Sequence, residues 1–375
     1  MEADDRRALR DAARSCLKEY AEWTADQHVE STKTGFDRSR WKLMAEQAGL
    51  QGVRIDERWG GAGLGLSAEL IVHEEMGRAL YSGPYFGVAQ VAAALSEMTD
   101  DPANHERLAA IAAGDLIAVP ALPIEETFPL EYPEVIRSDS NVLELSGSLP
   151  CIVDAQIADA LLVLADFEGF HAFFWVDTTA PGVQISPLET VDLTRRMSSV
   201  SFDRVPVEVV AQQDRARAAV AAVRQGTALA LSAECVGLAT RALELTVEYV
   251  KVRSQFGQLI GSFQAVKHSC ADLFVGLEAA RSALVLATRG VETNDMIGRR
   301  PESLAGLAVA RMYCGRIAFD IANESIHLHG GIGFTWEHRA HLYYRRAKSN
   351  QSLLDSTGRQ ARLLTSSVLA MHQAT

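Results

Sequence analysis

The 375-residue chain has no long uninterrupted hydrophobic segment. A membrane-spanning helix needs roughly 18 or more consecutive apolar residues, and no stretch approaches that length. The chain starts with MEADDRRALRDAARS, which is charged and lacks the apolar core of a secretory signal. We therefore expect a cytoplasmic protein without a membrane span.

Cysteine is scarce, and the spacing of the few cysteines fits neither a metal site nor a disulfide framework. No two of them form a CxxC pair. We expect reduced, buried thiols and no metal site, because isolated cysteines usually pack as small apolar residues. The cysteines are Cys16, Cys151, Cys235, Cys270 and Cys314.

Positively charged residues are also fewer than negatively charged ones. The chain has 36 Lys and Arg against 48 Asp and Glu, which gives a net charge of −12. A protein that binds mainly nucleic acid needs a basic face, so the charge argues against that class of partner. It does not exclude a small anionic ligand, which needs only a local arginine or a helix N-terminus.

A chain of this length fits two or three domains, and its sequence pattern changes twice. Residues 1–113 have apolar residues at helical spacing. Residues 114–212 contain short β-rich runs separated by Gly and Pro. Residues 213–375 return to helical spacing. The sequence therefore predicts a mainly α protein with a β middle domain.

In the first segment, the spacing predicts helices near residues 9–17, 41–50, 67–80 and 105–113. The glycine-rich residues 60–65 interrupt this pattern, because glycine weakens helices and permits positive φ. They carry no phosphate-binding motif, so we interpret them as a structural loop.

In the middle segment, short runs rich in β-branched and aromatic residues predict a small β-barrel or sandwich. These runs are residues 142–145, 160–164, 173–176, 183–185 and 200–202.

In the last segment, long Ala- and Leu-rich stretches predict helices that pack as a bundle. Gly330-Gly331 is expected to end one of them as a C-cap. The expected helices cover residues 216–250, 264–289, 301–329 and 352–372.

Three short strings are more specific than this order of segments. Arg-Ser-Gln-Phe-Gly occupies residues 253–257 and is followed by Phe-Gln-Ala-Val-Lys-His at 263–268. His-Leu-His-Gly-Gly-Ile-Gly occupies residues 327–333. Trp-Gly-Gly-Ala-Gly-Leu-Gly occupies residues 59–65, with Gly-Arg-Ala-Leu at 77–80. In this order and at this separation, the chain resembles the acyl-CoA dehydrogenase family over nearly its whole length.

The resemblance implies a helical N-domain (1–113), a β-barrel middle domain (114–212), a C-terminal four-helix bundle (213–375) and FAD as cofactor. In that family a carboxylate removes the α-proton of a CoA thioester, and the β-hydride passes to the flavin. The FAD spans two subunits, because the C-terminal domain of one contacts the pyrophosphate and adenosine of a flavin held by its partner. The matching FAD-contacting positions are Arg253, Phe256, Gln264, His327, Leu328, His329, Gly330 and Gly331.

The chemistry of these positions suits that role. A guanidinium such as that of Arg253 pairs bidentately with phosphate oxygens, Phe256 offers a flat face, and a glycine pair permits close backbone approach. Taken singly, Arg253 would be a solvated charge and Phe256 a core residue, so the interpretation depends on their common register. His327 and His329 have no third ligand at metal spacing, so we expect no metal.

The catalytic base of the family has no counterpart here. Leu354 occupies one of the two family positions for the base, and Thr227 occupies the other. Neither side chain can accept a proton from a carbon acid. Asp355 is adjacent to Leu354, but one step along a helix rotates a side chain by about 100°. No catalytic residue is therefore expected in this chain.

The middle segment also departs from the family. Residues 120–127 lack the family's Gly-Ser-Asp, and residues 148–154 lack the tryptophan that lies against the flavin. The chain thus resembles the non-catalytic subunit of heteromeric acyl-CoA dehydrogenases of actinobacterial steroid catabolism. The implied partner is a homologous catalytic chain that holds the acyl-CoA substrate, with two chains of each kind and two FAD sites. An electron-transfer flavoprotein is the implied electron acceptor.

Two alternatives remain open. A self-sufficient homomeric flavoenzyme would use Asp355 or another carboxylate such as Glu234 as its base. A family-derived scaffold would bind a partner without any catalysis. The intact FAD-contacting positions count against the scaffold, which has no need of them.

Overall fold

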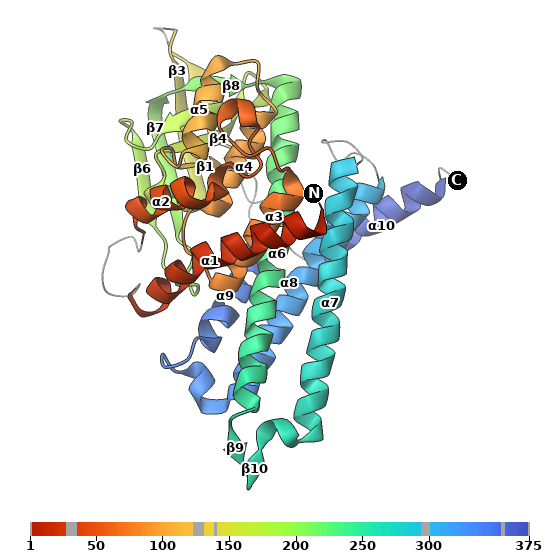
Figure 1. Ribbon diagram of the computed structural model, residues 1–375. Coiled ribbons are helices and arrows are strands. Elements are labelled where there is room, and N and C mark those ends of the chain that lie inside the picture. Colours follow the sequence, from red (N-terminus) through yellow and green to blue (C-terminus); the bar gives the residue numbers. More distant parts are fainter. Residues whose placement is uncertain are drawn as a thin grey trace.

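The computed structural model describes residues 2–27, 36–122, 131–138, 141–293, 301–353 and 357–373. Helices from the two ends of the chain flank a sheet that its middle part forms (Figure 1). This arrangement confirms the expected fold class, with helical parts before and after a central sheet.

The N-terminal helices begin and end where the sequence has capping residues. Asp37 accepts hydrogen bonds from the backbone N–H groups of Ser39 and Arg40, and Gly49 closes the same helix in the left-handed conformation. The glycine-rich residues 60–65 form the expected loop. The helices are α1 (Ala3–Gln27), α2 (Arg38–Ala48), α3 (Leu66–Ala79), α4 (Tyr85–Ser96) and α5 (Pro102–Ala112).

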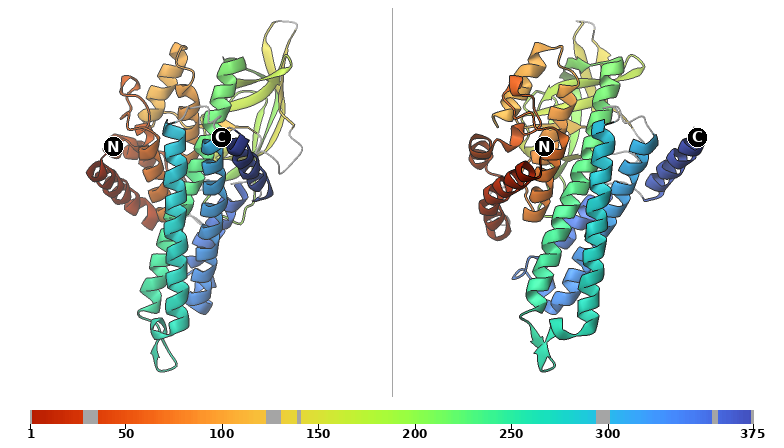
Figure 2. Two further views of the ribbon diagram at one scale, coloured as in Figure 1. Left: turned by 90° about the vertical axis from the view of Figure 1, so that its right-hand side faces the viewer. Right: turned by 45° about the vertical axis from the view of Figure 1, so that its right-hand side comes forward.

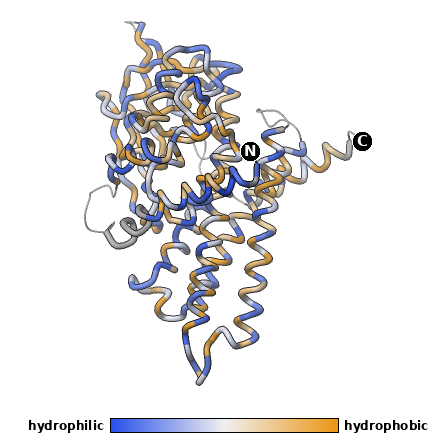
Figure 3. The backbone as a smooth tube through the Cα atoms, in the orientation of Figure 1, coloured by the Kyte–Doolittle hydropathy of each residue, from blue (hydrophilic) through white to orange (hydrophobic). Residues whose placement is uncertain are grey.

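Helix α4 was not expected from the sequence. Its residues YFGVAQVAAALS are almost uniformly apolar, so they show no hydrophobic stripe with a polar opposite face. The structure explains this composition, because ten of its twelve residues are buried. Helix α1 shows the opposite character, with many hydrophilic residues along its length (Figure 3).

The middle part forms one mixed sheet in which β4 (Ala160–Phe167) is central and almost entirely buried. The strand order is β6-β7-β3-β2-β4-β5-β8, and β1 pairs in parallel with β4. Within the described residues this ladder is an open path, so hydrogen bonds do not close the expected barrel there. The other strands are β1 (Ala118–Ala121), β2 (Glu134–Arg137), β3 (Leu143–Val153), β5 (Phe170–Asp177), β6 (Val183–Pro187), β7 (Met197–Pro206) and β8 (Glu208–Ala211).

The C-terminal part is built on three long helices, α6 (Gln213–Val250), α7 (Gln264–Thr293) and α8 (Pro301–His329). They lie side by side and extend away from the sheet (Figure 2). The helix expected over residues 352–372 corresponds for most of its length to α10 (Thr357–Gln373), and its first two residues belong to α9 (Ala340–Leu353), which was not expected. Residues 354–356 lie outside the described part of the chain.

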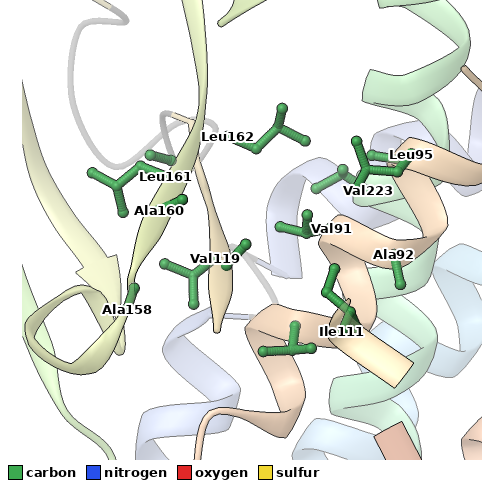
Figure 4. Packing of buried hydrophobic residues seen from close by; sticks show 14 of the residues in the cluster. Val91, Ala92, Leu95, Ile111, Val119, Ala158, Ala160, Leu161, Leu162 and Val223 are labelled. Atoms are coloured by element: carbon green, nitrogen blue, oxygen red, sulfur yellow. The ribbon is translucent and has the colours of Figure 1, made fainter. Parts of the chain in front are cut away.

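Apolar side chains from all three parts of the chain meet in one core. Val91 and Leu95 from α4 lie near Leu162 of β4 and Val223 of α6 (Figure 4). Helices α3 and α6 approach so closely that a Cβ on Gly237 would lie 1.7 Å from the carbonyl oxygen of Glu74. Glycine is therefore required at this crossing.

A buried network of charges joins the same parts. The Glu234 carboxylate on α6 accepts hydrogen bonds from the guanidiniums of Arg195 and Arg346, at 2.7 Å and 2.5 Å respectively. Arg346, on α9, also pairs with Asp192 at 3.0 Å and donates to the carbonyl oxygen of Tyr81. Each charged side chain in this set is at most 4% exposed. The network therefore ties α6 and α9 to the segment between β6 and β7 and to the chain after α3.

Removing one partner from this network should destabilise the fold strongly. In Arg346→Met, Glu234 keeps the Arg195 guanidinium but Asp192 loses its ion pair with Arg346, so a buried charge is left poorly compensated. We expect a loss of about 3–5 kcal/mol in the free energy of unfolding, measured with urea.

The matched control is Arg217→Met, which removes an ion pair with Asp214 whose side chains are 74% and 94% exposed. This change should cost less than about 1 kcal/mol. Equal losses in the two variants would contradict a structural role for the buried network.

Candidate functional site

The Arg-Ser-Gln-Phe-Gly string forms a hairpin at the far end of α6. Strands β9 (Ser254–Gln255) and β10 (Gln258–Leu259) pair, and Phe256 and Gly257 form the turn between them. Both turn residues have positive φ, 54° and 78°, as a two-residue type I′ hairpin turn requires. Positive φ is unfavourable for a bulky residue such as phenylalanine. The turn nevertheless presents the Phe256 side chain with 91% of its surface exposed.

The backbone of Arg253 is fixed while its side chain is exposed. Its N–H donates to the carbonyl oxygen of Tyr249, and its own carbonyl accepts from Ile260 N–H at 2.9 Å. Within the described residues its guanidinium has no ion-pair partner. Gln264 is exposed at the start of α7, which follows the 3-10 turn Ile260–Ser262. A positioned and exposed guanidinium of this kind can bind an anion.

The second string ends α8. Gly330 has φ +63° and begins the 3-10 turn Gly330–Phe334, which confirms the expected end of the helix at the glycine pair. An added Cβ on Gly330 or Gly331 would meet nothing within 4 Å, so the backbone here faces open space. His327 is exposed, Leu328 half-buried and His329 buried.

Contacts between α6 and α8 bring the two strings to the same end of the bundle. The Tyr249 ring, one turn before Arg253, lies 4.5 Å between centroids from the ring of His329. The Thr246 hydroxyl also donates to the Ser325 hydroxyl at 2.8 Å. Figures 1 and 2 show the β9-β10 hairpin at this end, remote from the sheet. We call this end, residues 249–264 and 327–338, the tip.

The tip exposes several large apolar side chains. Exposed apolar groups gathered in one region usually mark a surface that contacts a partner. They are Val252 at 74%, Phe256 at 91%, Leu259 at 45%, Phe334 at 74% and Trp336 at 66% exposure.

Three histidines pack beside the glycine pair. The rings of His329 and His338 lie 4.2 Å apart, and His329 Nδ1–H donates to the carbonyl oxygen of Ser325. Burial lowers the pKa of His338 to about 4, with further contributions from His329 and His341. Within the described part of the chain, no cluster of His, Cys, Asp or Glu is arranged to hold a metal ion.

Thr227, at one family position for the base, lines a chamber of about 160 Å³ beneath the end of β3. Leu353 also lines it, whereas Leu354 and Asp355 lie outside the described residues. Among the described lining residues there is no Asp or Glu. The chamber therefore offers no proton acceptor from that part of the chain.

Two further lining residues, Arg224 and Arg311, were missed by the sequence analysis. The available signal was weak, because a single arginine in an Ala-rich helix usually lies at the surface.

Glu234, the alternative base, belongs to the buried network instead. Burial alone would raise the pKa of this carboxyl, but Arg195 and Arg346 outweigh burial and lower it to about 2. A general base functions best when its pKa lies near the working pH. The geometry therefore argues against Glu234 as a base.

Buried His73 lies against the same network, in a small cavity that Glu234 and Arg195 also line. Burial lowers the pKa of His73 from 6.5 to about 4, with an additional lowering by Arg195 that Glu234 opposes. His73 is 1% exposed and packs edge-on against the ring of Tyr85. It is therefore neutral in the folded chain at neutral pH.

Family models match two parts of the chain. The acyl-CoA dehydrogenase N-terminal domain matches residues 3–115, and the acyl-CoA dehydrogenase C-terminal domain matches residues 217–367. Acyl-CoA dehydrogenase IpdE2 of Mycobacterium tuberculosis is 32% identical over 97% of this chain and 98% of its own length. The chain belongs to the acyl-CoA dehydrogenase family. Members of this family depend on FAD.

Solved structures agree with this assignment. A glycine-to-alanine variant of the Tcur3481–Tcur3483 steroid ACAD is 27% identical, has a TM-score of 0.86 and covers 99% of both chains. The ChsE4–ChsE5 complex from Mycobacterium tuberculosis, at 24% identity, shares the fold with a TM-score of 0.87 over 98% of both chains.

Among the described residues of this chain, no helix is both long enough and apolar enough to cross a bilayer.

The depressed pKa of His73 predicts a pH-dependent stability. Above pH 6.5 the histidine is neutral in both folded and unfolded chains. As the pH falls from 6.5 towards 4, the unfolded chain takes up the proton first, so stability is lost over this window. The difference between 6.5 and about 4 corresponds to about 3 kcal/mol for this fully buried group.

His73→Phe should remove this contribution, because phenylalanine does not titrate. We expect the stability difference between wild type and variant to shift in favour of the variant as the pH falls from 7 to 4, measured by urea unfolding. The exposed control His268→Phe should show no such trend. A difference that stays constant with pH would contradict the assignment.

Proposed function

We propose that this chain is a non-catalytic subunit of an FAD-dependent acyl-CoA dehydrogenase, and that its tip completes the FAD site of a homologous catalytic chain. One asymmetry carries the proposal. The tip presents Arg253, Phe256 and the open glycine pair to the outside, while the chamber at Thr227 has no described carboxylate. The chain can thus contact a cofactor without supplying the base for its reaction.

The described residues of the tip fit a dinucleotide. The exposed Arg253 guanidinium would pair with the pyrophosphate, because its planar donors match phosphate oxygens. The open space over Gly330 and Gly331 would admit close approach of a charged group to backbone N–H groups. Phe256 would offer its exposed ring as a stacking face. FAD, when bound, supplies the hydride acceptor, and this chain holds and orients its distal half.

The family relatives support a two-chain assembly. The Tcur3481–Tcur3483 steroid ACAD and the ChsE4–ChsE5 complex each join two differently named chains. By analogy, we propose two chains of each kind with two FAD sites, and a steroid-derived CoA thioester bound on the catalytic chain. The exposed apolar residues of the tip would be covered by that chain.

The homomeric alternative depends on Asp355, since Glu234 is held in the buried network. It requires the chain alone to bind FAD and to oxidise an acyl-CoA. Purification of the chain without a sister chain, followed by a flavin spectrum and a dye-reduction assay, separates the two. A flavin-loaded, active lone chain would favour the homomeric enzyme.

Arg253→Ala should lower the FAD content of the complex with the catalytic chain. A charge-assisted hydrogen bond contributes about 1.5–3 kcal/mol, so we expect roughly ten- to a hundredfold weaker FAD binding, with assembly unchanged. The measurement is flavin absorbance per complex after gel filtration over a range of FAD concentrations. Arg253→Lys should rescue only partly, because an ammonium lacks the planar paired donors.

The matched control is Lys251→Ala, which removes an exposed positive charge two residues away. This variant should retain FAD. If the Arg253→Ala and Lys251→Ala complexes retained the same amount of FAD, Arg253 would be only a solvated charge.

Gly331→Ala tests whether something from outside this chain approaches the glycine pair. Gly331 has no positive φ, and an added Cβ would meet nothing within 4 Å, so the variant should fold normally. If a partner's cofactor lies against this backbone, FAD occupancy should fall by about tenfold or more at limiting FAD.

Gly306→Ala, within α8, is the control. There an added Cβ makes only ordinary contact, 3.5 Å from Ala287. Both variants should fold, and Gly306→Ala should be about 1 kcal/mol more stable than wild type, because alanine is the better helix former. Normal FAD occupancy in Gly331→Ala would place the cofactor away from the tip.

A further inference from the structure

Helix α7 carries an exposed apolar surface along one outer side of the bundle (Figure 1). Phe274 and Val275 are 56% and 67% exposed, and Val285 and Leu286 are 46% and 64% exposed. The second pair follows the first after about three helical turns, so both pairs lie on the same side of the helix. We call these four residues the α7 stripe. Single exposed apolar residues are ordinary, but a group of them in one region marks a contact surface.

The opposite side of α7 is already packed within the chain. Leu277 and Leu284 are buried in the core that α7 shares with α6 and α8. Arg281 donates hydrogen bonds to the Glu74 carboxylate on α3 and to the Thr240 hydroxyl on α6. These contacts fix the rotation of α7 about its own axis. The α7 stripe therefore faces outwards and cannot turn into the core of its own chain.

The side chains along this face have a symmetric order. Lys267 precedes Phe274 by seven residues, and Glu292 follows Val285 by seven. The midpoint of Lys267 and Glu292 therefore coincides with the midpoint of Phe274 and Val285, at the peptide bond between positions 279 and 280. The midpoint of the other two stripe residues lies one position further along, a displacement of about 1.5 Å. Both charged end residues are exposed.

This order makes the face complementary to itself. In a contact with two-fold symmetry, residue i of one copy meets residue j of the other, and j meets i. Two antiparallel α7 helices that share the midpoint would bring apolar pair against apolar pair, and Lys267 against Glu292 of the second copy. A parallel arrangement would instead set lysine beside lysine and glutamate beside glutamate. The charge order therefore favours a second copy of this chain, in antiparallel orientation, as the occupant.

The existing contacts of the charged residues are compatible with this pairing. Glu292 accepts hydrogen bonds from the backbone N–H and the hydroxyl of Ser67, which a carboxylate can do while it also pairs with a cation. Glu278, near the midpoint, lies 3.3 Å from the Arg281 guanidinium of its own helix. Two copies would therefore not bring uncompensated carboxylates together at the centre of the contact.

We propose that α7 is the contact surface between two copies of this chain, packed antiparallel about a two-fold axis near positions 279 and 280. The α7 stripe of each copy covers that of the other, and the pairs of Lys267 with Glu292 at the two ends set the register. In the two-plus-two assembly proposed above, this contact joins the two non-catalytic chains. The contact itself needs neither FAD nor the catalytic chain, so its failure would leave the proposed function untouched.

Sedimentation equilibrium of the full chain, purified alone, tests the proposal. We expect a dimer, and Val275→Asp and Leu286→Lys should each weaken it about tenfold or more, because a charge is then buried against an apolar side chain. Val191→Asp is the matched control, since Val191 is also 67% exposed but lies between β6 and β7. This control should associate like wild type. All three variants should keep wild-type urea unfolding, because the changed side chains are exposed.

A mixture of the Val275→Asp and Leu286→Lys chains tests the register. In a mixed antiparallel dimer, the new carboxylate faces the new ammonium, and the other apolar contact, between the unchanged Leu286 and Val275, is intact. The mixture should therefore associate more tightly than either variant alone. A wild-type chain that stays monomeric at its highest soluble concentration would overturn the proposal. So would stripe variants that associate like wild type, or a mixture no tighter than its components.

Discussion

The buried contact of Glu234 with Arg195 and Arg346, together with the hydrogen bond from Arg346 to the Tyr81 carbonyl oxygen, joins the three parts of this chain. The three residues belong to α6, the segment before β7 and α9, and none of these positions is near another in sequence. Burying such charges is costly unless good geometry and further hydrogen bonds compensate them. Here Asn350, Thr194 and backbone carbonyls supply those bonds. Glu234 is consequently held as an anion by two arginines, and this argues against the base role that its chemistry alone would allow.

That junction also sets the direction of the helices that carry the tip. Helix α6 contains 38 residues, so it spans roughly 57 Å. One part of it borders the chamber at Arg224 and Thr227, and its far end leads into the hairpin at Arg253. Chamber and tip therefore lie at separate positions along one helix. This separation is compatible with the proposal that the tip contacts a cofactor although the described lining of the chamber includes no carboxylate.

Much of the architecture was predictable because it depends on local pattern. The long Ala- and Leu-rich runs gave α6, α7 and α8 close to their observed bounds, and the five predicted β runs all fall within or next to observed strands. Helix α4 was missed because it is apolar on all sides, and β1, β2 and β8 because each has only four residues. Helix α9 was also missed by the sequence analysis.

The positions expected to contact FAD form short strings with a fixed order, and local geometry decides how they are presented. Phe256 and Gly257 form a turn because they connect the two short strands β9 and β10, which pair with each other. Gly330 ends α8 because glycine adopts positive φ without strain. The sequence by itself thus determined the family, most of the helical and β segments and the two strings that form the tip. Only the tertiary structure decided that Glu234 is bound by two arginines and that Arg224 and Arg311 share one wall. Such pairings join residues up to 112 positions apart, and no local pattern encodes which distant side chains will meet.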